Sequence, residues 1–163
     1  MAERAGRLRH LDASGAARMV DVGAKAPARR EAVARGRVRL GKRAFRLVRE
    51  NRAAKGDVLG VARIAGIQAA KRTAEWIPLC HWVPLEGICV DFRLEPRASA
   101  VDITARVSAR WSTGVEMEAM TAVAAAALAV YDMCKSVERG IEIGPIRLTL
   151  KRGGRSGEYC RRG

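Results

Sequence analysis

The stretch TGVEMEAMTAVAAAALAV, from Thr113 to Val130, decides how this chain folds. It begins a helix predicted over residues 114–138, and its part Ala119–Val130 is apolar around nearly the whole circumference. A helix that is apolar on every side is buried on every side. A chain of 163 residues has difficulty covering such a helix alone, so the pattern predicts an oligomer interface along it.

The start of this helix carries three candidate side chains. Thr113 and Glu116 have the spacing of a capping box, so we expect Glu116 to be structural. Glu118 points about 200° away from Glu116 around the helix axis. Glu118 is therefore the better candidate for contact with a ligand.

The segments on either side of the long helix predict strands. Residues 85–95 and 100–111 alternate between polar and apolar positions, which predicts a hairpin that turns at residues 96–99. Residues 141–150 form a last strand, and residues 31–40 form a first strand with an arginine-rich outer face.

Two further helices are predicted between the first strand and the hairpin. Residues 42–50 have helical spacing, and residues 57–76 form a helix that Asp57 caps and Pro78 stops. The order strand, helix, helix, hairpin, helix, strand predicts an α+β fold. Its sheet is mostly antiparallel, with helices packed on one face.

Length and composition predict a single domain over residues 1–163, because 48% of the residues are hydrophobic and no second composition regime appears. We expect residues 1–18 and 152–163 to be flexible. The first residues contain no apolar core of a signal peptide, and no uncharged apolar run reaches membrane-spanning length. These features predict a cytoplasmic protein without a membrane partner.

The net charge of +14, from 31 basic and 17 acidic residues, favours an anionic partner. Nucleic acid, anionic lipid and a polyphosphate metabolite all qualify, and a general bias toward arginine explains the charge equally well. For nucleic acid, no predicted strand carries the aromatic pair on which single-stranded bases stack.

The cysteines do not predict a metal site. No two of them form a CxxC pair, and the chain has only two histidines, so a structural zinc site is not expected. Cys89 and Cys134 lie in apolar runs, and we expect both to be reduced core residues.

The end of the long helix is the most informative part for chemistry. Asp132 and Lys135 are three positions apart and share a helix face. A carboxylate and an ammonium at the edge of an apolar core are candidates for acid–base work. A salt bridge that merely ends a buried helix is the alternative.

Other candidates lie on the two segments before the hairpin. Lys55 and Gly56 precede a helix start, where anions are favoured. Lys71 lies near the end of that helix, where a solvated lysine is the alternative reading. His81 follows Pro78 in a loop with Cys80, and no second histidine is available there as a base, so His81 is expected to orient substrate or transfer protons.

Spacing along the long helix separates two of the candidates. Glu118 and Asp132 are fourteen residues apart, which corresponds to roughly 21 Å along the axis. A nucleotide-sized ligand cannot easily touch both in one chain. If both are functional, two subunits supply one composite site at an interface.

Several stretches, in order, resemble the molybdenum-cofactor biosynthesis protein C family, the cyclic pyranopterin monophosphate synthases. The resemblance runs from about residue 8 to residue 158. It rests on Met19–Val22, Lys55–Asp57, Ala62–Lys71, Ile77–His81, Thr113–Ala119 and Tyr131–Lys135.

The resemblance implies a ferredoxin-like α+β fold and a homohexamer, a trimer of dimers with active sites at interfaces. It implies conversion of (8S)-3′,8-cyclo-7,8-dihydroguanosine 5′-triphosphate to cyclic pyranopterin monophosphate with release of pyrophosphate. It implies a lyase of molybdenum cofactor biosynthesis that uses no redox cofactor, and magnesium can accompany the triphosphate. The sequence itself predicts no dedicated metal site.

The resemblance also implies roles for individual residues. Asp132 corresponds to the catalytic acid or base, and Lys55 and Lys135 to the catalytic lysines. Lysine suits proton transfer because, unlike arginine, it can readily lose its proton. The residues that match substrate-binding positions are Leu79, Cys80, His81, Met117, Glu118, Lys25, Arg30, Lys71 and Lys151.

Two residues depart from the family pattern. Trp82 stands where proline usually follows the Leu-Cys-His triplet, and Ser112 stands where a basic residue often precedes Thr113. The first departure alters the loop around His81, and the second removes one phosphate contact. A nucleic-acid-binding module and a catalytically silent homologue are the rival interpretations, and the presence of Lys55, Asp132 and Lys135 speaks against the second.

Overall fold

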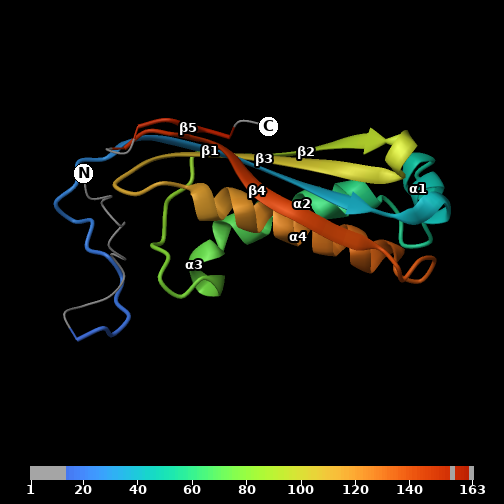
Figure 1. Cartoon of the computed structure of the whole chain (residues 1–163), viewed down its shortest axis with the longest axis horizontal. Coiled ribbons are helices and arrows are strands. Elements are labelled where there is room, and N and C mark those ends of the chain that lie inside the picture. Colours follow the sequence, from blue (N-terminus) through green and yellow to red (C-terminus); the bar gives the residue numbers. More distant parts are fainter. Residues whose placement is uncertain (1–13, 155–156, 162–163) are drawn as a thin grey trace, which may run out of the picture.

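The computed structural model describes residues 14–154 and 157–161. One antiparallel five-stranded sheet, in the order β2-β3-β1-β4-β5, is covered on one face by helices, as Figure 1 shows. This confirms the predicted α+β fold. Residues 1–13, 155–156 and 162–163 lie outside the described residues, so the expected flexibility of both chain ends stays a prediction.

The four predicted strands are present, and a short fifth strand was not predicted. The strands are β1 (Ala28–Arg39), β2 (Gly87–Glu95), β3 (Ala100–Trp111), β4 (Glu142–Arg152) and β5 (Tyr159–Cys160). In β1 the small or branched residues Ala32, Ala34 and Val38 are buried, and the alternating arginines lie on the other face of the sheet. The hairpin turns through a short 3-10 helix at Pro96–Ala98, as expected.

The helices are α1 (Gly41–Arg49), α2 (Val58–Lys71), α3 (Thr73–Trp76) and α4 (Glu116–Cys134). The Asp57 carboxylate accepts a hydrogen bond from the Gly60 amide at 2.9 Å, which confirms the predicted cap. The helix predicted over 57–76 is interrupted at Arg72. There the Thr73 hydroxyl donates to the carbonyls of Ala69 and Ala70, which competes with continued helix bonding.

The predicted capping box at the start of α4 is wrong. The helix begins at Glu116, its N-cap is Val115, and no side chain caps it. The Glu116 carboxylate instead forms an ion pair with Lys151 of β4 at 3.2 Å. A partner distant in sequence thus takes the carboxylate that local spacing had assigned to the cap.

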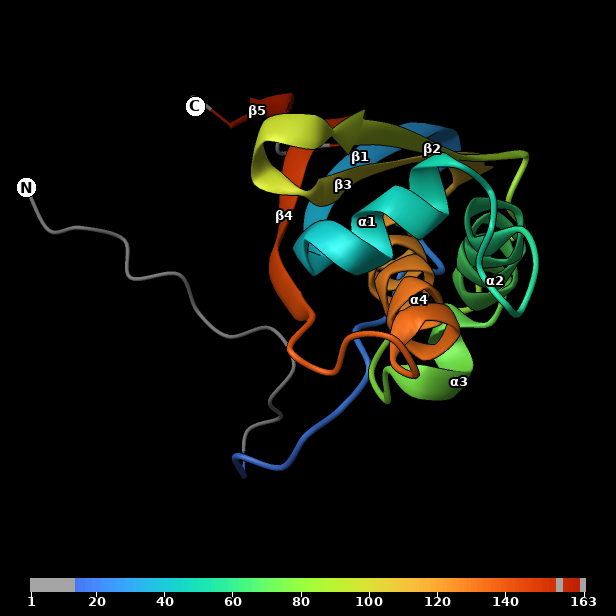
Figure 2. The ribbon, with the colours of Figure 1, turned by 90° about the vertical axis from the view of Figure 1, so that its right-hand side faces the viewer.

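One chain covers most of α4, contrary to the difficulty that its composition suggested. Figure 2 shows α4 beside α2 beneath the sheet. Gly36 of β1 and Gly66 of α2 allow this close approach, because an added Cβ would lie 2.6 Å from Val123 Cγ1 and 2.9 Å from the Ala122 oxygen, respectively. By length and composition α4 could span a membrane, and 61% of that window is buried inside the chain, as in the core helix of a soluble protein.

The two cysteines that were expected in the core differ. Cys134 is buried at the end of α4, as predicted, whereas Cys89 is exposed on β2. Strand alternation explains the error, since Val90 of the same run takes the inward position. Both thiols are free.

Candidate active site

The predicted site residues gather mainly at the two ends of α4. The lysine–aspartate cluster, formed by Lys55, Asp132 and Lys135, lies at its carboxyl end. The helix-start pocket lies at its amino end. It encloses about 480 Å³ and is lined by Val20, Val22, Lys25, Ile77, Leu79, Cys80, His81, Thr113, Gly114, Glu116, Met117 and Glu118.

In the lysine–aspartate cluster, two ammonium groups hold one carboxylate. Lys135 Nζ lies 2.6 Å from Asp132 Oδ1, and Lys55 Nζ lies 2.9 Å from Oδ2 and 3.0 Å from the Asp132 carbonyl oxygen. Lys55 reaches α4 from the turn before α2, where Gly56 adopts a φ of +92°. All three side chains remain about half exposed, so the cluster is open to a ligand.

The hydrogen bonds from Lys135 and Lys55 lower the pKa of Asp132 to about 2, and the Asp132 carboxylate raises the pKa of Lys135. Asp132 is therefore a carboxylate anion at neutral pH, and Lys135 is a charged ammonium. The sequence argument had favoured lysine for its ability to lose a proton. In this chain, the pairing with Asp132 opposes the loss of a proton from Lys135.

The helix-start pocket is closed on one side by the loop that carries His81. The His81 Nε2 lies 2.7 Å from the carbonyl oxygen of Val20. Because a carbonyl oxygen only accepts hydrogen bonds, Nε2 is the protonated ring nitrogen and donates a hydrogen bond to it. The bond joins the loop to the segment before β1. Burial contributes most to raising the pKa of the Cys80 thiol, and the negative charges of Glu118 and Glu116 raise it further. Cys80 is thus a thiol at neutral pH, which argues against a nucleophilic role.

Glu118 is the unusual group of this pocket. Its side chain is only 3% exposed, and its Oε2 atom has no hydrogen-bond partner among the described residues. Burial, reinforced by the neighbouring Glu116 charge, raises the pKa of Glu118 to about 7. A buried carboxyl with an unpaired oxygen beside a cavity is suited to bind a polar group or exchange a proton with it.

Glu118→Gln should make the stability less dependent on pH. A raised carboxyl pKa means that the folded state holds a proton that the unfolded chain releases, so stability falls as pH rises from about 4.5 toward 7. Glutamine removes this loss. The free energy of unfolding of the variant, relative to that of the parent, should therefore be about 2 to 3 kcal/mol higher at pH 8 than at pH 5. Urea unfolding of both proteins at pH 5 and at pH 8 measures the stability gap between them. A gap of the same size at both pH values would contradict the raised pKa of Glu118.

The remaining predicted residues have different surroundings. Lys151 and Glu116 pair at the rim of the pocket, and Arg30 is buried, with its donors on backbone carbonyls. Lys71 is exposed at the end of α2 and lines neither the pocket nor the lysine–aspartate cluster. Trp82 is 67% exposed beside the His81 loop.

Sequence reasoning missed several residues that line the pocket. Val20, Val22, Ile77, Thr113 and Gly114 were quoted as parts of motifs, but none of them was predicted to contact a ligand. Their only signal was that they belong to those motifs.

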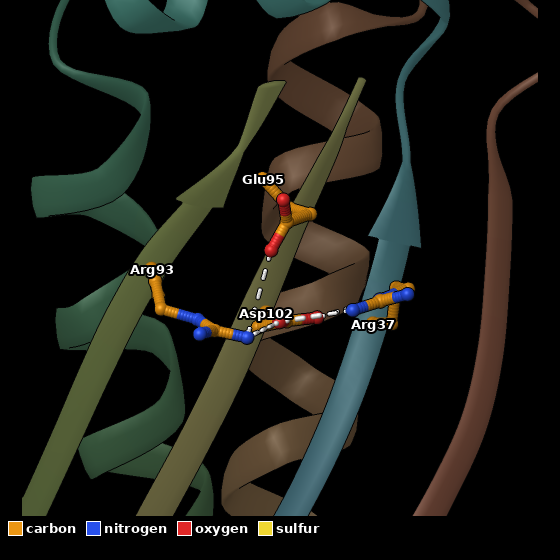
Figure 3. Close-up of polar contacts among 4 residues, drawn as sticks. All are labelled: Arg37, Arg93, Glu95 and Asp102. Carbon is orange, nitrogen blue, oxygen red and sulfur yellow. Dashed lines mark hydrogen bonds and ion pairs between the residues drawn. The ribbon is translucent and has the colours of Figure 1, made fainter. Parts of the chain in front are cut away.

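The face of the sheet that the helices leave uncovered is the surface on which a nucleic-acid-binding protein of this fold would carry stacking aromatic rings. Figure 3 shows Asp102 of β3 between Arg37 of β1 and Arg93 of β2. The Asp102 carboxylate lies 2.6 Å from Arg37 Nε and 2.9 Å from Arg93 Nη2. The hydrogen bond from Arg37 is the largest cause that lowers the pKa of Asp102. Phe92 packs beneath Arg63 on the helix side, 5.5 Å from the guanidinium carbon to the ring centroid. Among the described strands, this face therefore offers arginines without an adjacent pair of stacking rings.

The structure confirms that Glu118 and Asp132 lie at opposite ends of one continuous helix, α4. Fourteen residues, roughly 21 Å along α4, separate Glu118 from Asp132. One chain therefore does not bring the pocket and the cluster together. The catalytic and substrate-binding roles of these residues stay predictions.

Relatives of this chain cover nearly its whole length. It is 55% identical over 161 residues to a protein of Chloroflexus aurantiacus, which covers 99% of both chains. It is 60% identical over 154 residues to one of Thermomicrobium roseum, 94% of this chain and 93% of the other. It is 56% identical over 156 residues to one of Pelotomaculum thermopropionicum, 96% and 92%. Each relative is named cyclic pyranopterin monophosphate synthase. Residues 19–154, which carry both ends of α4, match the MoaC family, and the chain belongs to that family.

Proposed function

We propose that this chain is a lyase of molybdenum cofactor biosynthesis. It converts (8S)-3′,8-cyclo-7,8-dihydroguanosine 5′-triphosphate to cyclic pyranopterin monophosphate and releases pyrophosphate. The names of its relatives support this conversion. The observation that carries it is the lysine–aspartate cluster, in which Asp132 lies between Lys55 and Lys135.

The reaction needs the groups that this cluster supplies. Rearranging the purine part opens and closes rings through several proton transfers, and these require positioned acids and a base. Asp132 accepts a proton, and Lys135 and Lys55 donate protons when a ligand displaces them from the carboxylate. Forming the cyclic phosphate breaks the bond between the α and β phosphates, and cationic side chains stabilise the charge that develops on the pyrophosphate.

The active site combines the lysine–aspartate cluster of one subunit with the helix-start pocket of another. The separation of Glu118 from Asp132 supports this arrangement. So do large apolar side chains that are exposed on the helices: Val61 and Ile64 of α2, Trp76 of α3, and Met117 and Leu128 of α4. Leu128 is 54% exposed in the single chain. A homohexamer, a trimer of dimers, places such surfaces against one another and completes each site.

No resident cofactor is part of the proposal, and magnesium enters only with the triphosphate. Among the described residues, no group of three or more His, Cys, Asp or Glu side chains could hold a metal ion. The protein acts in the cytoplasm on a small molecule, without a nucleic-acid or membrane partner. The burial of α4 in the chain and the absence of a stacking pair on the described strands support this part.

The test is direct supply of the substrate. Purified protein is incubated with the cyclised guanosine triphosphate, and the pterin product is measured by its fluorescence after oxidation, together with released pyrophosphate. We expect both products in equal amounts. Pyrophosphate without pterin would refute the rearrangement, and neither product from an oligomeric, folded protein would refute the function.

A further inference from the structure

Arg30 is a buried arginine whose guanidinium is engaged by the backbone. Its side chain is 8% exposed. Its Nε donates to the carbonyl of Trp111 at 3.0 Å, and its Nη2 donates to the carbonyl of Ser112 at 3.3 Å. One planar group thus joins the start of β1 to the connection between β3 and α4. A guanidinium suits this task because its donors form a rigid fork.

A pair of glycines packs against the same guanidinium. Gly153 and Gly154 follow β4 with φ values of +89° and +86°. A Cβ added at Gly154 would collide with Nη1 of Arg30, and one added at Gly153 would collide with the carbonyl oxygen of Arg29. The chain therefore needs glycine at both positions for two reasons, namely the left-handed backbone and the space that Arg30 and its neighbour fill.

This junction of three segments extends into the helix-start pocket. The Ser112 hydroxyl donates to the carbonyl of Lys25 at 2.9 Å, and Lys25 lines the pocket. Lys151, two residues before the glycine pair, reaches Glu116 at 3.2 Å. The segments that carry Lys25, Glu116 and Lys151 are therefore each joined, directly or through one neighbour, to the carbonyls that Arg30 binds or to the glycines packed beside it.

We propose that Arg30 is a positioning residue for substrate binding. It fixes the connection after β3 and the glycine turn after β4, and thereby places the Lys25 and Lys151 ammonium groups around the anionic part of the substrate. Ser112, which departs from the family's basic residue, extends the same junction through the Lys25 carbonyl. The substrate in this inference rests on the proposed function, whereas the role of Arg30 in holding the junction can be tested without substrate.

The first experiment replaces the arginine with two different residues. In Arg30→Ala and Arg30→Lys the KM for the cyclised triphosphate should rise by roughly tenfold or more, while kcat changes less than about threefold. Lysine should not rescue the KM, because one ammonium does not reproduce the fork across two carbonyls. A parent-like KM in Arg30→Lys would overturn the proposal, since it would show that a positive charge suffices. A fall in kcat at unchanged KM would overturn it as well.

The second experiment leaves Arg30 in place and uses a matched glycine. Gly157 also has a positive φ, +69°, but an added Cβ there meets nothing within 4 Å. Gly154→Ala should raise the KM as Arg30→Ala does, whereas Gly157→Ala should leave it within about twofold of the parent. The effect of Gly154→Ala should also shrink in an Arg30→Ala background, because the collision partner is gone. Equal effects of the two glycine variants would refute the packing argument.

A third measurement does not depend on the reaction. Amide hydrogen exchange, followed by mass spectrometry without substrate, should become at least about tenfold faster in residues 111–114 and 150–154 together when Arg30 is replaced by alanine. Ser112→Ala, which keeps the Arg30 bonds, should loosen only the segment around Lys25. Unchanged exchange in Arg30→Ala would overturn the junction even if the parent proves to be an active lyase. Loosened segments with an inactive parent would instead count against the proposed function alone.

Discussion

Asp132→Ala is expected to lower kcat for the cyclised triphosphate by roughly 10²- to 10⁴-fold, the range associated with a general acid or base. The carboxylate accepts hydrogen bonds from both Lys55 and Lys135, at 2.9 Å and 2.6 Å. Removing it takes away the base and also releases the two ammonium groups from their positions. Product formation under saturating substrate measures the effect.

The folded structure should survive this change, because the Asp132 side chain is about half exposed and its ion pairs lie at the surface. Asp91→Ala is a suitable control. Asp91 is an exposed aspartate of β2 that accepts a hydrogen bond from the Cys89 thiol, away from both ends of α4. Its variant should keep the parent rate. Parent-like turnover by Asp132→Ala would show that Asp132 is not the catalytic carboxylate.

Lys55→Ala and Lys135→Ala should lower kcat in the same direction, because each removes a proton donor next to Asp132. The pKa of Asp132 supplies a second readout. With either lysine gone, the remaining one still lowers this pKa, but less, so the acid limb of the pH–rate profile should move to higher pH. An acid limb that does not move in either variant would mean that it belongs to another group.

Much of the fold could be predicted because its strongest signals are local. The hairpin of β2 and β3 follows from alternation, and α4 follows from a long apolar run. Two of the errors arise where partners distant in sequence decide. Glu116 pairs with Lys151 rather than capping α4, and the two-residue strand β5 exists only by pairing with β4.

The candidate site shows the same division. Motifs singled out Lys55, Asp132 and Lys135, and the fold brings these three together across more than seventy residues of chain. Sequence could not reveal that Glu118 is buried with an unpaired oxygen. It also could not reveal that the donors of Arg30 are engaged by carbonyls eighty residues away. Both facts depend on how separate segments pack, which no local pattern encodes.

Mixed oligomers of two inactive variants should recover activity. Asp132→Ala chains keep an intact helix-start pocket, and Glu118→Ala chains keep an intact lysine–aspartate cluster. If each site takes its pocket from one subunit and its cluster from another, random mixing at equal amounts regenerates complete sites with a frequency of about one quarter. The mixture should then reach up to about a quarter of the parent rate, far above either variant alone.

The physical basis of this expectation is the length of α4, which keeps its two ends apart in every chain. The variants are unfolded together, refolded and shown to be mixed by differently sized tags, and their activity is compared with that of each variant refolded alone. A mixture of Asp132→Ala and Lys135→Ala chains is the control. Both changes disable the same cluster, so no mixed site is complete and no activity should return. No rescue in the test mixture despite proven mixing would mean that each chain builds its own site. Rescue in the control would mean that Asp132 and Lys135 do not act from the same chain.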